Sequence, residues 1–394
     1  MKVNNTLRYS YYDLASNDIF IWFINPHNCI MQIEIETGVC TCLGEIPGTY
    51  GINNVYTRIM YVDSKLILIP SFACAICEYD LIEKTYRFYD FSEELKVIVD
   101  YRPQLTGKTL YKEVLYLHGR CPVIVKYDMS SHDISLIKIP QGIVSKIPPA
   151  YSFFGSCSRL IGDKILFGIS DANGYILLDV NSESVEYVAL NQNEQNKKVM
   201  MIEYIDTNRY VVRVDAEGLL EMQKYNLESQ IASTKKYRLK VKEVDKGIPY
   251  LWMQLQNDKL YLFSWEARVS YVVSLDTDEV KVLDMPCCDE YDSDWDYYAG
   301  TEITDDMIVT IHPWTKKLVL IDAQSSLVKV KDIRLAKDTE VVFRDIARKR
   351  FRECAIINEY EELIDVKDYL DMDIDLAQER GNDITIGQQI WNKI

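Results

Sequence analysis

The chain repeats one pattern seven times at nearly constant spacing. The segment YDLIEKTYRFYDF, which begins at Tyr79, returns as YDMSSHDISLIKIP from Tyr127 and as LDVNSESVEYVAL from Leu178. We align the copies on one acidic or amide residue, the anchor residue, and successive anchors lie 46, 48, 51, 47, 50 and 46 residues apart. Such a period indicates a repeat architecture rather than several unrelated domains. The seven anchors are Glu34, Asp80, Asp128, Asp179, Asn226, Asp276 and Asp322.

Each repeat predicts the same four strands, which we call A, B, C and D. Strand B is a dense apolar run, such as 66–69, that ends well before the anchor. Short β-branched runs bounded by Gly, Pro, Asn and Asp are typical of buried strands. Strand C ends at the anchor, a polar turn of four or five residues follows, and strand D closes the unit, as at 86–88. A weaker strand A, such as 56–60, precedes strand B.

A single four-stranded sheet cannot bury both of its faces, whereas sheets arranged radially cover one another. The repeats resemble the β-propeller superfamily, with a period between those of kelch and WD40 repeats. The resemblance implies an all-β, seven-bladed β-propeller of four-stranded antiparallel blades over residues 6–335, followed by a short α-helical C-terminal extension, 336–394. The Gly-Gly doublet of kelch repeats, the Trp-Asp of WD40 repeats and the sialidase Asp-box are absent, so the resemblance names no particular family.

Turn chemistry explains the anchor residue. An Asp at the start of the C–D turn accepts hydrogen bonds from backbone N–H groups two residues further on. The ring is expected to begin with residues 7–12 and to finish at 328–335, with no obvious strand exchanged between its ends. Residues 340–343 fit either an added edge strand or the tail.

Charge and composition exclude some classes of function. The formal charge is −16, and the repeats contain no basic stretch of the kind that displaces counterions from nucleic-acid phosphates. The N-terminus lacks the apolar region of a signal peptide, and no apolar run is long enough to span a membrane. The ten Cys then indicate reduced thiols in a cytoplasmic protein.

The predicted binding surface is the face that carries the B–C turns and the D–A linkers, which we call the loop face. Trp, Tyr and Arg are enriched at binding hot spots, and several occur in these loops. The alternative is that these aromatic side chains fold back over the blade ends. The loop-face candidates are Phe72, Tyr101, Arg102, His118, Arg120, Trp265, Arg268, Trp295, His312 and Trp314.

The C-terminal extension provides a second candidate contact. Its last ten residues begin with a capping box and place Ile386 and Ile390 on one helix face, with Trp391 nearby. This helix either packs against the side of the propeller or docks in a partner's groove.

Neither a metal nor a cofactor is predicted. His27, His118 and His312 belong to the loop face of three separate repeats, so we interpret them as polar turn residues rather than zinc ligands. Cys74 and Cys77 form a CxxC, but it runs into a strand, where positions three apart point to opposite faces. Phosphate-binding glycine loops and nucleophile elbows are missing.

Two functions remain after these exclusions. The first is a non-catalytic scaffold that binds a protein or peptide on the loop face, with the tail as a further contact. The alternative is a carbohydrate-binding protein or a carbohydrate-active enzyme that uses the central channel and its aromatic rim. Carboxylates facing each other across the channel would support the enzyme, because glycoside hydrolysis uses a carboxyl pair.

Overall fold

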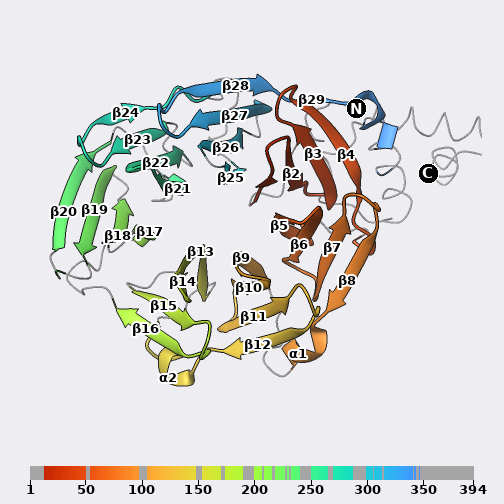
Figure 1. Cartoon of the computed structure of the whole chain (residues 1–394), viewed down its shortest axis with the longest axis horizontal. Coiled ribbons are helices and arrows are strands. Elements are labelled where there is room, and N and C mark those ends of the chain that lie inside the picture. Colours follow the sequence, from red (N-terminus) through yellow and green to blue (C-terminus); the bar gives the residue numbers. More distant parts are fainter. Residues whose placement is uncertain are drawn as a thin grey trace, which may run out of the picture.

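The structure is a computed structural model of the whole chain. It describes residues 13–49, 54–96, 104–147, 153–169, 174–189, 199–205, 208–214, 218–226, 229, 232–239, 250–264, 269–286, 299–304, 306–312, 315–339, 341–342 and 346. Seven small antiparallel sheets form a closed ring, with the first strand of each sheet nearest the centre and the last strand outermost (Figure 1). The chain is therefore a seven-bladed β-propeller, as the repeats predict.

The blades follow one another in chain order, and each has four antiparallel strands except blade 1, which has a fifth. Blades 1 to 3 comprise β1 (Ala15–Ser16), β2 (Phe20–Ile24), β3 (Cys29–Glu34), β4 (Val39–Glu45); β5 (Tyr56–Val62), β6 (Lys65–Pro70), β7 (Ala75–Asp80), β8 (Tyr86–Asp90); and β9 (Leu105–Tyr111), β10 (Val114–Gly119), β11 (Val123–Asp128), β12 (Ile134–Lys138).

Blades 4 to 7 repeat the same order of strands. They comprise β13 (Phe154–Ile161), β14 (Lys164–Ile169), β15 (Gly174–Asp179), β16 (Val185–Ala189); β17 (Val199–Ile205), β18 (Asn208–Val214), β19 (Leu219–Asn226), β20 (Ala232–Arg238); β21 (Tyr250–Gln256), β22 (Lys259–Ser264), β23 (Tyr271–Ser274), β24 (Val280–Val282); and β25 (Ala299–Thr304), β26 (Met307–His312), β27 (Lys317–Asp322), β28 (Val328–Asp332).

Helices are short in this fold. Helices α1 (Ser92–Lys96) and α2 (Gln141–Val144) lie in the links from blade 2 to blade 3 and from blade 3 to blade 4. A further helical turn covers residues 337–339. The amphipathic helix predicted near the C-terminus lies outside the described residues.

Five of the seven anchor residues make the turn predicted for them. Asp80 Oδ1 accepts hydrogen bonds from the backbone N–H groups of Ile82 (2.8 Å) and Glu83 (2.9 Å). Such amide bonds are the largest cause of a lowered carboxyl pKa at this position in four blades, because they stabilise the ionised form. The same contacts to backbone N–H groups occur at Asp128, Asp179, Asn226 and Asp322.

The anchor predicted for blade 6 is wrong by two residues. Ser274, not Asp276, ends strand β23 and pairs with Lys259, as Asp80 pairs with Lys65 in blade 2. The backbone N–H of Ser274 bonds to the carbonyl of Glu279 (2.9 Å), five residues on, as in the other turns. Asp276 fits the anchor pattern in the sequence because it is acidic, but Ser274 occupies the position at the end of strand C that the anchors of the other blades occupy. With Ser274 as anchor, the last two intervals become 48 and 48 residues.

In blades 3, 4, 6 and 7, the residue four positions after the anchor links the blade to the one before it. It has a positive φ, as at His132 (63°), Glu183 (55°) and Ser326 (60°). The His132 ring stacks on Tyr89 of blade 2, with 4.5 Å between ring centroids. Equivalent contacts between neighbouring blades join Lys126 to Glu183, Tyr237 to Asp278, and Tyr261 to Ser326.

A short parallel strand closes the ring. Strand β29 (Arg334–Leu335) leaves blade 7 and pairs with β4, the outer strand of blade 1, as its fifth strand (Figure 1). The Arg334 N–H bonds to the Gly38 carbonyl (3.0 Å), and the Cys42 N–H bonds to Thr339 Oγ1 (3.0 Å). The expectation that no strand is exchanged between the ends of the ring is wrong, because residues 334–335 pair in parallel with blade 1. Residues 341–342 are helical, so they are not the added edge strand.

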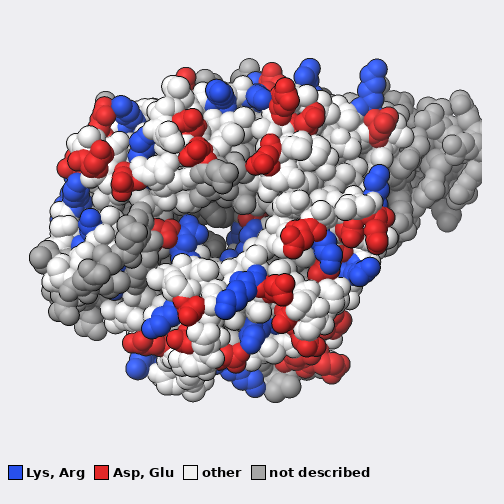
Figure 2. Space-filling view, viewed as in Figure 1, with Lys and Arg blue, Asp and Glu red and all other residues white. Residues whose placement is uncertain are grey.

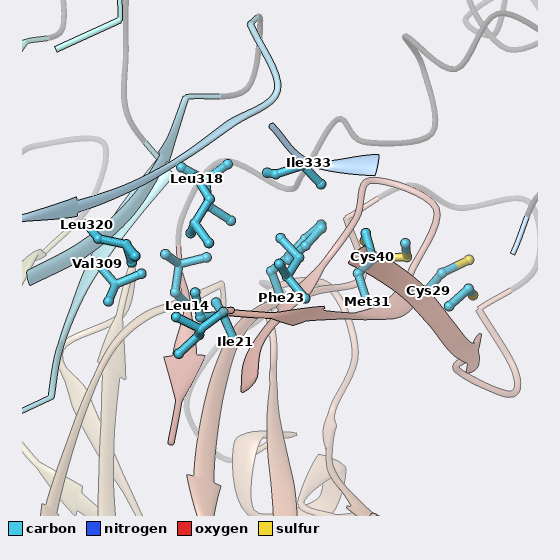
Figure 3. Close-up of a cluster of buried hydrophobic side chains, with 14 residues drawn as sticks. Leu14, Ile21, Phe23, Cys29, Met31, Cys40, Val309, Leu318, Leu320 and Ile333 are labelled. Atoms are coloured by element: carbon cyan, nitrogen blue, oxygen red, sulfur yellow. The ribbon is translucent and has the colours of Figure 1, made fainter. Parts of the chain in front are cut away.

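The core consists of apolar layers between neighbouring blades. Between blades 7 and 1, Val309, Leu318 and Leu320 face Phe23 and Met31 (Figure 3). Strand B is buried in every blade because it lies between strands A and C and packs against the blades on both sides. The dense apolar runs of the sequence correspond to these central strands.

Candidate functional site

The B–C turns and the D–A linkers lie on one face, as predicted. In blade 2, the N–H groups of Ser71 and Phe72 in the B–C turn bond to the carbonyl of Val55 at the entry to strand β5, at 2.7 and 3.1 Å. In blade 3, the Arg120 N–H bonds to the Gln104 carbonyl (3.3 Å). These backbone bonds give the loop face a fixed frame in both blades.

Two predicted loop-face residues are accessible in this frame. Phe72 exposes 38% of its surface. Arg120 is half-buried in the equivalent turn of the next blade. Its carbonyl accepts a hydrogen bond from the Phe153 N–H (3.0 Å), which ties the turn to the entry of blade 4.

His118, a predicted loop-face residue, is buried in the core rather than exposed on that face. Its side chain is fully buried, and its ring lies edge-on to Phe154 and Phe167, at centroid distances of 5.3 and 4.9 Å. Neither ring nitrogen has a hydrogen-bond partner among the described residues. Burial, with a smaller contribution from the Arg58 cation, lowers the His118 pKa to about 3. His118 is therefore a neutral core residue, placed inward because it continues strand β10.

His312 is also buried rather than exposed on the loop face. Its Nδ1 lies 2.7 Å from Thr315 Oγ1 and accepts the Thr315 N–H at 3.2 Å, so it shapes the turn after strand β26. His27 is buried in the B–C turn of blade 1, where its N–H bonds to Asn25 Oδ1 (3.0 Å). In the part of the chain that the structure describes, no three His, Cys, Asp or Glu residues are grouped to hold a metal ion.

The other predicted site residues lie outside the described residues, and their roles stay predictions. On the loop face these are Tyr101, Arg102, Trp265, Arg268, Trp295 and Trp314, and in the tail they are Ile386, Ile390 and Trp391.

A belt of polar contacts that the sequence did not predict joins the inner strands around the channel. Asp13, just before strand β1, accepts a hydrogen bond from the Ile59 N–H of blade 2 (3.0 Å) and pairs with the Lys108 ammonium of blade 3. Lys108 also donates to the Ile59 carbonyl. One cation and one carboxylate therefore fasten three blades to one another.

The belt continues into blades 4 and 5. Ser158 Oγ donates to the Lys108 carbonyl (3.0 Å) and accepts from Thr109 Oγ1 (2.6 Å). Arg159 Nε then donates to Glu203 Oε2 (2.6 Å). Figure 2 shows that the ring is hollowed at its centre, with Lys or Arg atoms beside the opening. The sequence cannot reveal this belt, because each member comes from a different blade and none belongs to a shared motif.

The two carboxylates of this belt, Asp13 and Glu203, each pair with a cation. Both ion pairs join one blade to another, and the carbohydrate hypothesis stays a prediction.

The comparisons with known proteins support the fold alone. No family model matches the chain, and no curated protein matches it in sequence. Solved structures do match. The computationally designed Ika8 protein has a TM-score of 0.52 and 9% identity over 82% of this chain and 86% of its own. Hsv2 of Kluyveromyces lactis, with loop 6CD replaced by a Gly-Ser linker, has a TM-score of 0.51 and 10% identity over 82% and 98%.

A third similar structure is that of U3-55K, with a TM-score of 0.51 and 12% identity over 76% of this chain and 86% of that one. At such low identities, the similarity supports a shared architecture and does not indicate a shared function. In the described part of the chain, we find no helix with the length and apolarity needed to cross a membrane.

Proposed function

We propose that this protein is a non-catalytic propeller that binds a protein or peptide on its loop face. The observation that carries the proposal is Phe72, an aromatic side chain with 38% exposure on a turn fixed by backbone hydrogen bonds. Arg120, a half-buried residue, lies in the equivalent turn of the adjacent blade. Aromatic and Arg side chains on a rigid frame are typical of binding hot spots, because little conformational entropy is lost on binding.

The channel wall supports the same proposal. The carboxylates of Asp13 and Glu203 are ion-paired with Lys108 and Arg159 from other blades. This arrangement favours a role in holding blades together. A rigid ring that carries variable loops is suited to recognition.

The test is a comparison of three baits in a native-host lysate, with bound proteins quantified by mass spectrometry. The baits are the wild-type chain, the Phe72→Ala/Arg120→Ala variant and the control Ile82→Ala. Ile82 is 78% exposed in the C–D turn of blade 2, at the opposite end of the blade from the loop face. If Phe72 and Arg120 are hot spots, each truncation costs about 2 kcal/mol, and the partner is lost from the double variant alone.

Equal retention of every bound protein by all three baits would contradict the proposed surface. Loss of the same partner from both variants would indicate general destabilisation, which a thermal melt of each bait would reveal independently. Trp265 and Trp314 extend the predicted surface, and the double variant Trp265→Ala/Trp314→Ala tests them in the same assay.

A further inference from the structure

Three thiols lie together in blade 1, close to the point where the ring closes. Cys29 on β3 and Cys40 and Cys42 on β4 belong to one buried cluster with Met31 and Ile33 (Figure 3). Cys29 and Cys40 are fully buried, and Cys42 is 9% exposed. The closing segment, residues 334–339, covers this edge of the blade, and we call it the strap.

Strand register places Cys29 and Cys42 beside each other. Met31 pairs with Cys42, and Cys29 pairs with Glu45, with an irregularity between Ile30 and Met31. Cys29 is thus the diagonal neighbour of Cys42 on the same face of the sheet. Both side chains belong to the same buried cluster, and the interaction with Cys29 is the largest influence on the Cys42 pKa. The Cys29 thiol also donates to the His27 carbonyl (3.8 Å).

We propose that Cys29 and Cys42 form a reversible disulfide beneath the strap when the protein meets a peroxide. Cys42 is the attacking sulfur in this reaction, and Cys29 is the resolving thiol. Cys40 is excluded as the resolving partner because it lies two residues from Cys42 on the same strand, where the backbone holds the two side chains parallel.

The environment of Cys42 favours its thiolate. The hydrogen bond from Cys29 and that from the Gly44 N–H lower the Cys42 pKa against the opposing effect of burial. Burial and the neighbouring Cys42 raise the pKa of Cys40, which stays a thiol. Because the thiolate is the nucleophile, oxidation begins at Cys42.

The chemistry takes two steps. The Cys42 thiolate attacks one oxygen of hydrogen peroxide, the O–O bond breaks, and a sulfenic acid and hydroxide form. The Cys29 sulfur then attacks the Cys42 sulfur, the S–O bond breaks, and water leaves as the disulfide forms. The two thiols lose two electrons in total, and the peroxide gains them.

The strap limits access to this pair. Thr339 Oγ1 accepts the Cys42 N–H at 3.0 Å, and Thr339 itself is only 1% exposed. Peroxide therefore reaches the sulfurs of the closed ring only when the strap opens locally. Removal of the Thr339 hydroxyl by Thr339→Val is expected to raise the oxidation rate about fivefold, the effect of losing one hydrogen bond that holds the strap closed.

The test treats the folded full-length protein with hydrogen peroxide, blocks remaining thiols with N-ethylmaleimide and digests it with a protease that cleaves after Glu. Cleavage at Glu34 and Glu36 separates Cys29 from Cys42. We expect a linked pair of peptides that dithiothreitol separates. The link should persist in Cys40→Ser and disappear in Cys42→Ser, while Cys29→Ser should leave a sulfenic acid on Cys42 that dimedone traps.

Three results would overturn the proposal. The first is that Cys29 and Cys42 both remain alkylated after other thiols of the chain have oxidised. The second is that the link is lost in Cys40→Ser, which would make Cys40 the partner. The third is that the link appears only in urea, because the pair would then be inaccessible in the native fold. Circular dichroism of each variant before oxidation identifies any that fails to fold.

Discussion

Gly38 is the residue on which the ring closure depends most directly. It has φ +70°, and a Cβ at this position would lie 2.3 Å from the carbonyl oxygen of Asp332, just before strand β29. The substitution Gly38→Ala therefore brings two penalties. Ala in a left-handed conformation costs about 1–2 kcal/mol, and the clash must push the strap away from blade 1.

The clash endangers three hydrogen bonds between the strap and strand β4 or the turn before it. These are the Arg334 N–H to the Gly38 carbonyl (3.0 Å), the Ala336 N–H to the Cys40 carbonyl (2.9 Å) and the Cys42 N–H to Thr339 Oγ1 (3.0 Å). At about 1 kcal/mol each, their loss adds about 3 kcal/mol to the cost of the backbone strain.

Gly48→Ala is the matched control. Gly48 lies in the linker after the same blade and has φ +77°, and a Cβ added to it would meet no atom within 4 Å, so it carries the strain without the clash. Hydrogen exchange measures how much more easily the strap opens in Gly38→Ala than in Gly48→Ala. In Gly38→Ala, amides of the strap and of strand β4 should exchange about a hundredfold faster than in Gly48→Ala, the equivalent of about 3 kcal/mol. Equal exchange in the two variants would refute the claim that this contact holds the ring closed.

Three other predictions follow from buried or turn-forming side chains. Because the His118 pKa falls to about 3 on folding, only the unfolded state takes up this proton between pH 6.5 and 3. Stability should fall by about 2 kcal/mol from pH 6.5 to pH 5, and urea denaturation at several pH values should show a weaker dependence of stability on pH in His118→Leu than in the wild-type protein. Tyr261→Phe removes hydroxyl bonds to the Ala323 carbonyl (2.9 Å) and Ser326 (3.1 Å), and should cost about 1–2 kcal/mol in urea denaturation. Asp128→Ala removes the acceptor of the Ser130 and Ser131 N–H groups and should lower the melting temperature, whereas Asp133→Ala, in the same turn, should leave it unchanged.

The fold could be predicted from the sequence because its signals are local. Strand B in each blade is buried on both sides, so a run such as 66–69 is apolar throughout and is visible without any alignment. The Asp80 turn is equally local, since its hydrogen bonds span two and three residues. Both features recur around the ring, and their spacing identifies the propeller.

The candidate site could be predicted only in part, because burial at the end of a strand depends on the neighbouring blade. His118 and Arg120 are two residues apart, yet the first is enclosed by Phe154 and Phe167 of blade 4 and the second is half-exposed. The pairing of Asp13 with Lys108 joins residues 95 positions apart. Such contacts depend on how blades pack, and no single repeat encodes them.

The turn between strands C and D has features that are set by the local sequence and others that depend on the neighbouring blade. Its anchor and its positive φ four residues later are set locally, and so the repeat is regular. The side chain at that later position meets the preceding blade, and it differs in every case, being His132, Glu183, Asp278 and Ser326. Each is matched by a different partner, namely Tyr89, Lys126, Tyr237 and Tyr261. We infer that the blades share one backbone plan, while these individual pairs distinguish one junction from the next and help to fix the order of the blades around the ring.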